Sequence, residues 1–190
     1  DLIMIDRSME VINDIPQFNP SMLPTSIEEY TYIDLKSNIK HNFMRDYSNK
    51  KEIIFENDKV VSPSELRKLN VFNSIAAGNP ILLNSTVDCE FYFPNQWLSP
   101  NNDYYMVKVK GDSMINANIN DGDMVVIKHQ NTANNYDIVA VDLDGNTTLK
   151  RLVRMGSTIL LMPENPAYEP IPINEGQIRI LGVAVGVVKG

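Results

Sequence analysis

The second half of the chain consists of short runs in which β-branched and aromatic residues predominate. Gly, Asn, Asp and Pro separate these runs, as in sheets whose strands are joined by tight turns. This pattern predicts an antiparallel β-rich domain, which we place at residues 85–190. Strands are expected within residues 103–111, 123–129, 137–145, 147–155, 157–163 and 177–188. The last of these runs is apolar on both faces, so it should be buried.

The first 70 residues carry a more mixed pattern, which predicts a small α+β segment. Following Ser26 as a helix cap, apolar residues recur at roughly helical steps, at Ile27, Tyr30, Ile33, Leu35, Ile39 and Phe43. We therefore expect a helix over part of residues 26–51. Residues 50–61 predict a strand, a turn and a second short strand. Residues 62–70 predict a short helix with Pro63 at its first position.

Composition narrows the functional classes. A hydrophobic content of 43% supports a sizeable core. The chain has neither an apolar run of roughly 20 residues nor a signal-peptide pattern, which predicts a cytoplasmic protein without membrane contact. Cys89 is the one cysteine, so no intrachain disulfide or cysteine metal cluster can form. His41 and His129 lie far apart in the sequence, and we expect no metal site and no cofactor.

The chain is acidic, with a formal net charge of -7. Residues 1–70 hold nine Lys and Arg against twelve Asp and Glu, and no helix-turn-helix can be read in them. A broad phosphate-binding surface is therefore not expected, although Lys36, Lys40 and Arg45 form a short basic patch. Because the chain does not begin with Met, we expect specific DNA binding to need a domain upstream of Asp1.

One connecting segment differs from an ordinary linker. Residues 73–83 read NSIAAGNPILL, which sets Ala77 and Gly78 inside a frame of apolar residues. Flexible linkers favour serine, glycine and charge instead. We treat residues 71–84 as a separate loop whose apolar residues suit it to bind to another protein surface.

A turn around Ser113 offers candidate chemistry. A strand is expected to end near Lys110, and Gly111 then permits a sharp turn that presents Ser113, with Asp112 and Met114 on either side. Backbone N–H groups of such a turn could stabilise an oxyanion beside a serine nucleophile. Taken alone, the tripeptide fits a serine that caps a short helix better than a nucleophile. A nucleophilic serine would also need a base.

Lys150 is the lysine best placed to be that base. Strand alternation puts Thr148, Lys150 and Leu152 on one face, so the lysine is expected to point inward among apolar neighbours. Burial disfavours the ammonium form and would leave a free amine that can accept the serine proton. The alternative is a solvated strand lysine whose alkyl stem covers its neighbours.

Ala77-Gly78, Ser113 and Lys150 occur in this order, together with DGD at 121–123, LKRL at 149–152 and PEN at 163–165. In these features the chain resembles the LexA family of self-cleaving repressors and their UmuD-like relatives, the S24 peptidases. The resemblance runs from about residue 74 to residue 190. It implies that Ser113 is the nucleophile, that Lys150 is the general base, and that the bond between Ala77 and Gly78 is cleaved.

The resemblance also implies partners and leaves two functions open. The first is a LexA-like or phage-like repressor, dimeric and operator-binding, that cleaves itself in an SOS-type response to DNA damage when activated RecA stimulates it. The second is a UmuD-like accessory protein whose cleavage switches its partners. A signal-peptidase-like enzyme would share the Ser-Lys chemistry, but the missing membrane anchor disfavours it. The homodimer is expected to include the apolar strand near residues 180–188.

Overall fold

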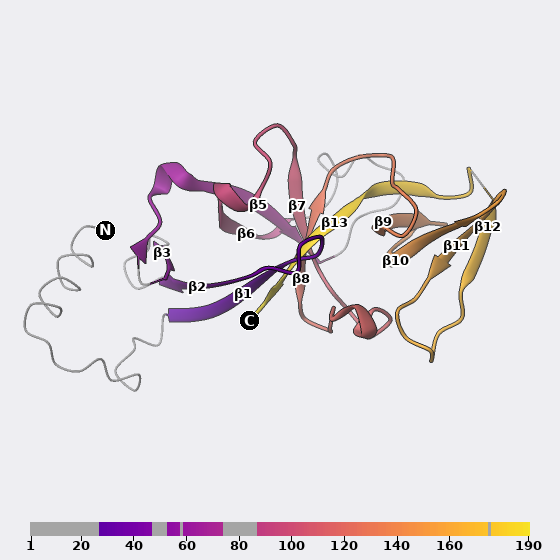
Figure 1. The fold of residues 1–190 in the computed structure, drawn as a ribbon, viewed down its shortest axis with the longest axis horizontal. Coiled ribbons are helices and arrows are strands. Elements are labelled where there is room, and N and C mark those ends of the chain that lie inside the picture. The colour runs from indigo at the N-terminus through magenta and orange to yellow at the C-terminus, as the bar shows by residue number, and fades with distance from the viewer. Residues whose placement is uncertain (1–26, 47–52, 58, 74–86, 175) are drawn as a thin grey trace, which may run out of the picture.

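The computed structural model of the chain describes residues 27–46, 53–57, 59–73, 87–174 and 176–190, which are folded mostly as β-strands (Figure 1). Three short 3-10 helices cover Pro63–Glu65, Asn95–Trp97 and Ile115–Ala117. No helix in these residues is long and apolar enough to cross a bilayer. The strands are β1 (Ile27–Asp34), β2 (Lys40–Asp46), β3 (Ile53–Glu56), β4 (Lys59–Val60), β5 (Leu66–Phe72), β6 (Val87–Pro94), β7 (Tyr104–Lys108), β8 (Met124–Lys128), β9 (Ile138–Leu143), β10 (Asn146–Met155), β11 (Thr158–Met162), β12 (Ile171–Asn174) and β13 (Arg179–Lys189).

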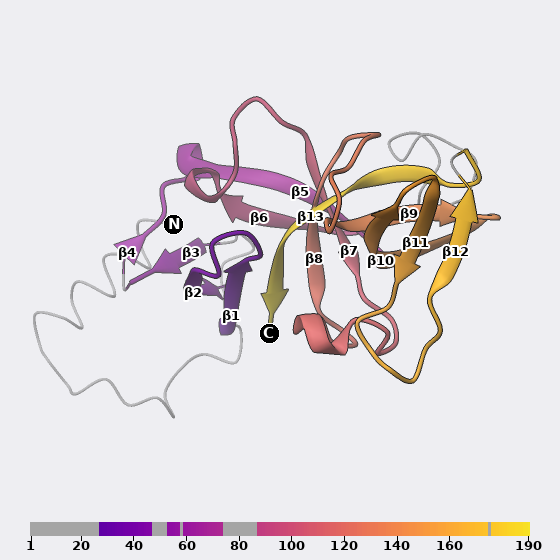
Figure 2. The same cartoon turned by 45° about the vertical axis from the view of Figure 1, so that its right-hand side comes forward.

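The strands form one continuous hydrogen-bonded sheet in the order β12-β11-β10-β9-β13-β1-β2-β3-β4, with β8, β7, β5 and β6 branching from β13. The last strand joins the two ends of the molecule, β9–β12 on one side and β1–β6 on the other (Figure 2). Its first part pairs with β9, and residues 186–189 pair with β1. Residues 183–188 pair with β8 along the opposite edge.

The β-rich prediction is confirmed, and each of the six runs expected between residues 103 and 188 contains a strand. The expected burial of the last strand is confirmed too, since Leu181, Val187 and Val188 are at most 4% exposed. Strands of the same chain cover it, and both hydrogen-bonding edges of residues 186–188 are occupied by β1 and β8. A dimer contact through those edges is therefore not open to the folded chain.

The expected helix within residues 26–51 is wrong, because β1 and β2 form an antiparallel hairpin there. The turn is closed by the carboxylate of Asp34, which accepts the backbone N–H groups of Lys36 and Ser37 at 3.0 and 2.7 Å. Asn38 follows in the left-handed conformation, with φ of 62°. Such local side-chain bonds favour a turn over a helix.

Two shorter predictions for the first part of the chain had different outcomes. The strand, turn and strand expected in residues 50–61 are confirmed as β3 and β4, with Asn57 at a positive φ of 51° between them. The helix expected over residues 62–70 begins with Pro63 but ends at Glu65, and the residues from Leu66 onward are β5. Strand pairing explains the difference, because β5 lies between β6 and β7.

The buried core has three apolar clusters. One, around Val139, Leu152 and Leu161, is built within residues 133–183. Another, around Val125, Ile127 and Leu181, lies under the β7–β8 region. The third, which we call the shared aromatic core, takes residues from β1, β2, β3 and β5 as well as from the later part of the chain: Tyr32, Phe43, Ile54, Leu69, Val71, Phe91, Phe93, Leu98, Met106, Val126 and Val188.

Candidate active site

Ser113 lies in the connection between β7 and β8, just after a sharp turn at Gly111. The φ of Gly111 is +91°, a backbone conformation that residues other than glycine rarely adopt. The backbone N–H of Gly111 donates to the carboxylate of Asp121 at 2.6 Å. Asp121 therefore stabilises the turn that precedes Ser113.

A second segment, residues 164–168, holds the serine turn from the other side. The backbone N–H of Glu164 donates to the carbonyl oxygen of Ser113 at 2.8 Å. The side-chain amide of Asn165 donates to the carbonyl oxygen of Asp112 at 2.9 Å, and the Tyr168 hydroxyl donates to the Asp112 carboxylate. These bonds restrict the positions that the Ser113 side chain can take.

Lys150 reaches the same place from the middle of β10. Its Nζ donates to Ser113 Oγ at 3.2 Å, to Thr148 Oγ1 at 2.7 Å and to the carbonyl oxygen of Leu149 at 3.0 Å. The residue is only 8% exposed, and Leu152 on the same face is fully buried. The inward orientation expected from strand alternation is therefore confirmed.

Burial lowers the pKa of Lys150 below its ordinary value, because the ammonium form loses hydration inside the protein. Among the ion pairs of the described residues, none involves Lys150, so no carboxylate there offsets this loss. The geometry and the electrostatics act together. The amine lies within reach of the serine hydroxyl, and its neutral form, which can accept a proton, is reached at a lower pH than in an exposed lysine.

The backbone beside Ser113 has N–H groups that are not used within the described part of the fold. Within the described residues, the N–H groups of Ser113 and Met114 have no hydrogen-bond acceptor. The side chain of Met114 is 2% exposed and anchors the turn in the core. Gly111, by contrast, already uses its N–H on Asp121. The N–H groups of Ser113 and Met114 are therefore candidate donors to a charge on the substrate, a role that stays a prediction.

Comparison with known proteins identifies the family. The sequence model of the Peptidase S24-like family matches residues 70–185, a range that contains both Ser113 and Lys150. The chain belongs to the Peptidase S24-like family.

Curated proteins with similar sequences support this family assignment. A LexA repressor of Mycolicibacterium smegmatis is 45% identical over 119 residues, which cover 63% of this chain and 48% of that protein. A LexA repressor of Mycobacterium tuberculosis is 44% identical over the same length, covering 49% of that protein. LexA repressor 2 of Nocardia farcinica is also 44% identical, with 48% of it covered. The chain thus spans about half the length of the curated relatives it matches.

The predicted site residues of the S24 chain have different outcomes in the structure. Ser113 and Lys150 are brought into contact, and Gly111, Asp112 and Met114 form the turn around the serine. The predicted cleavage bond, Ala77-Gly78, lies outside the described residues. On either side of it, Phe72 of β5 and Val87 of β6 are paired, so residues 73–86 connect two neighbouring strand ends.

Sequence reasoning missed several residues that shape the S24 site. Thr148 could have been found, because alternation already placed it on the face of Lys150. Tyr168 could not, since no local pattern shows that it binds Asp112, which lies far away in the sequence. Arg151, the next residue after Lys150, forms an ion pair with Glu164 and donates to the carbonyl oxygen of Tyr136 at 2.7 Å. It ties β10 to the segment that holds the serine turn.

Proposed function

We propose that this chain is the self-cleaving part of a LexA-like transcriptional repressor, and that it cuts its own bond between Ala77 and Gly78. One observation carries the proposal: the buried Nζ of Lys150 lies 3.2 Å from Ser113 Oγ. A serine hydroxyl beside an amine of lowered pKa is an activated nucleophile.

In the proposed reaction, neutral Lys150 takes the proton of Ser113 while Oγ bonds to the carbonyl carbon of Ala77. The backbone N–H groups of Ser113 and Met114 stabilise the resulting oxyanion. Lys150 then returns the proton to the amide nitrogen of Gly78 as the C–N bond breaks. A water molecule, deprotonated by Lys150, hydrolyses the acyl-serine. The products are a carboxylate at Ala77, an amino group at Gly78 and the restored hydroxyl.

The repressor role rests on the relatives that bear that name and on the resemblance to the LexA family. In this role the protein is a homodimer that binds operator DNA, and activated RecA stimulates its cleavage. The net charge of -7 does not favour phosphate contact by these 190 residues, so we assign operator binding to a separate domain.

A second function, a UmuD-like accessory protein whose cleavage switches its partners, is favoured by one feature of the fold. Strands β1 and β5, which precede the proposed cut, are paired with β13, β6 and β7, which follow it. Because these strands stay paired, a cut between β5 and β6 alters the surface near the cut more readily than it separates the two segments of the chain. Operator binding by the full-length gene product, measured before cleavage and again after the amino-terminal product is released, distinguishes the two functions, because only the repressor has an operator to lose.

Incubation of the purified chain at alkaline pH, followed by intact-mass spectrometry, tests the cleavage itself. We expect one fragment that ends at Ala77 and one that begins at Gly78. The rate should not depend on protein concentration, because the reaction is intramolecular. Ser113→Ala is the matched control and should stay whole. A different cut position, or cleavage of the control at the normal rate, would refute the assignment.

A further inference from the structure

The two sides of the proposed cut are joined by three strand ladders. Residues Thr31 to Asp34 of β1 pair antiparallel with residues 186–189 of β13. All of β5 pairs with β6, and the end of β5 also pairs in parallel with β7. The views from both directions show β5 beside β6 and β1 beside the end of β13 (Figures 1 and 2). None of these hydrogen bonds depends on an unbroken chain between Phe72 and Val87.

The shared aromatic core spans the same boundary. Five of its eleven buried residues precede the cut and six follow it, so neither cleavage product alone can exclude water from this core. The Tyr32 ring meets Phe93 edge-on at 4.8 Å between centroids and stacks on Trp97 at 5.4 Å. The Arg45 guanidinium lies 3.9 Å from the centroid of the Phe91 ring. Separation would expose these faces to water on both sides.

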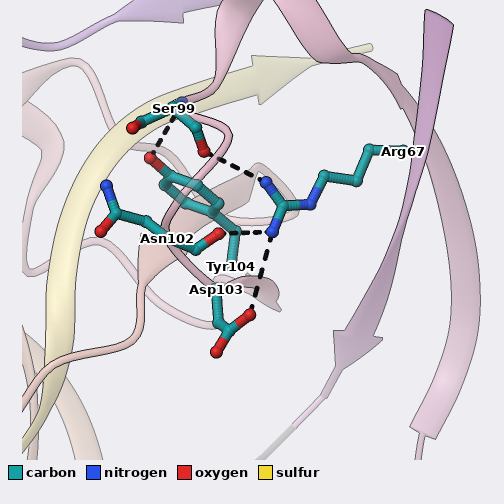
Figure 3. A network of polar contacts seen from close by, with 5 residues as sticks. All are labelled: Arg67, Ser99, Asn102, Asp103 and Tyr104. Atoms are coloured by element: carbon teal, nitrogen blue, oxygen red, sulfur yellow. Dashed lines mark hydrogen bonds and ion pairs between the residues drawn. The ribbon is translucent and has the colours of Figure 1, made fainter.

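Polar contacts fix the register at the outer end of the boundary. The guanidinium of Arg67 on β5 donates to the carbonyl oxygen of Ser99 at 3.2 Å and to that of Asn102 (Figure 3). It also lies 5.3 Å from the Tyr104 ring centroid. Both carbonyls belong to the connection between β6 and β7, after the cut. Arg67 therefore links the strand before the cut to a loop after it.

We propose that residues 87–190 form a binding surface for residues 27–72, so that the two cleavage products remain one folded complex. The partner of this surface is the chain's own amino-terminal product, held by β-strand pairing and the shared aromatic core. The regulatory meaning of the complex rests on the proposed self-cleavage, but the binding surface itself does not. Cleavage then leaves the fold assembled, and release of the amino-terminal product is a separate step.

An added protease tests the binding surface without relying on self-cleavage. The Ser113→Ala chain is given a recognition sequence for a site-specific protease within residues 74–86 and is cut to completion, as judged on a denaturing gel. Under native conditions, size-exclusion chromatography with light scattering should show both products in one peak with the mass of the uncut protein. Separate elution of the two products at micromolar concentration would overturn the proposal. Failure of wild-type self-cleavage would overturn only the proposed function.

The chain's one tryptophan reports on the complex directly. Trp97 follows the cut, and its ring contacts Tyr32 and His41, which precede it. We expect its emission in the cut protein to change on dilution, and the melting temperature to rise with protein concentration. In the uncut protein, whose two segments are covalently joined, this emission should not change on dilution, and the melting temperature should depend less on concentration. Emission and melting that are independent of concentration in the cut protein, with the two products eluting apart, would contradict the proposal.

Two leucine substitutions in the cut protein separate binding from general stability. Leu69, 1% exposed, lies in the shared aromatic core, whereas Leu161, fully buried, lies in the cluster built within residues 133–183. Leu69→Ala should weaken the complex at least tenfold, measured by dilution. Leu161→Ala removes the same atoms away from the boundary and should weaken it much less. Equal effects of the two substitutions would count against the shared core as the source of binding.

Discussion

Lys150 owes its chemistry to its place on β10. The strand turns the side chain inward, where its amine meets the hydroxyls of Ser113 and Thr148 and a backbone carbonyl. These neutral acceptors bind the Nζ protons, but they offset the lost hydration of an ammonium ion less than a carboxylate would. The site therefore combines a firm position with a lowered pKa, which are the two properties that a lysine base needs.

Self-cleavage should speed up as the pH rises. Because burial lowers the pKa of Lys150, the neutral amine accumulates at a lower pH than for an exposed lysine. Below that pKa the rate should rise about tenfold per pH unit, and above it the rate should level off. Single-turnover cleavage followed by gel densitometry gives the profile. A rate that falls with rising pH would show that the ammonium form is required.

Lys150→Arg should abolish cleavage at every usable pH. A guanidinium stays protonated, so it cannot take the proton of Ser113, although it keeps the positive charge and the hydrogen-bonding capacity. Circular dichroism should show the same β-rich fold as the parent. Measurable cleavage by this variant would mean that charge, and not proton acceptance, is the contribution of Lys150.

Gly111→Ala should impair both folding and cleavage. At a φ of +91° the new methyl group meets no atom within 4 Å, so the cost comes from the backbone, at about 1–3 kcal/mol. A displaced turn should also slow cleavage roughly ten- to hundredfold, since Ser113 follows two residues later. Gly176→Ala, with a φ of +94° in the turn before β13, is the matched control. It should lose similar stability in urea unfolding but keep its cleavage rate.

The sequence allowed some of these positions to be predicted, for physical reasons. The inward direction of Lys150 follows from the two-residue period of a strand, which is a local property. The 3.2 Å contact with Ser113 is not local: the residues alone made Lys150 a candidate base, and the resemblance to a family was needed to pair it with Ser113. The bonds from Asn165 and Tyr168 to Asp112 depend on where two distant loops meet, and no local pattern encodes that meeting.

Among the strands, β1 shows how tertiary pairing overrides a local pattern. The apolar spacing that suggested a helix is equally compatible with a strand in which Tyr32 and Ile33 are buried on opposite faces. What decides between them is the pairing of β1 with β13, which lies at the other end of the sequence. Strands β7 to β11 were easier to predict, because each has a pairing partner next to it in the chain. Strand β13 pairs with β1, β8 and β9, which are distant in sequence, and it was predicted from its apolar run alone.

Gly186→Ala tests the packing of β1 on β13. A methyl group at residue 186 would lie 2.0 Å from a ring carbon of Tyr32, so the two strands would have to move apart. We expect a loss of about 3 kcal/mol in the free energy of unfolding, measured with urea. In a Tyr32→Leu background the same substitution should cost clearly less, because the clashing ring is gone. Equal costs in both backgrounds would show that Tyr32 does not lie against Gly186.

Taken as a whole, the chain carries a net negative charge. We expect the 190-residue protein to bind DNA weakly and without sequence preference. Its net charge of -7 repels phosphates, and no short basic patch outweighs that charge. A gel shift on a palindromic operator from its own promoter, carried out with Ser113→Ala, is the measurement. Sequence-specific retention at nanomolar concentration would show that these residues contain an operator-binding surface.

The pairing of β1 with β13 also sets the order of events during synthesis. Thr31 pairs with Lys189, so this ladder cannot form until the ribosome has released β13, long after β1. Closing so long a loop is slow, and refolding on the millisecond-to-second timescale of non-local β folds is the natural expectation. Until then the aromatic side chains of β1 and β2 lack the part of their cover that Val188 of β13 provides. The nascent protein therefore passes through a stage in which it is prone to aggregate, and the synthesis of β13 ends that stage.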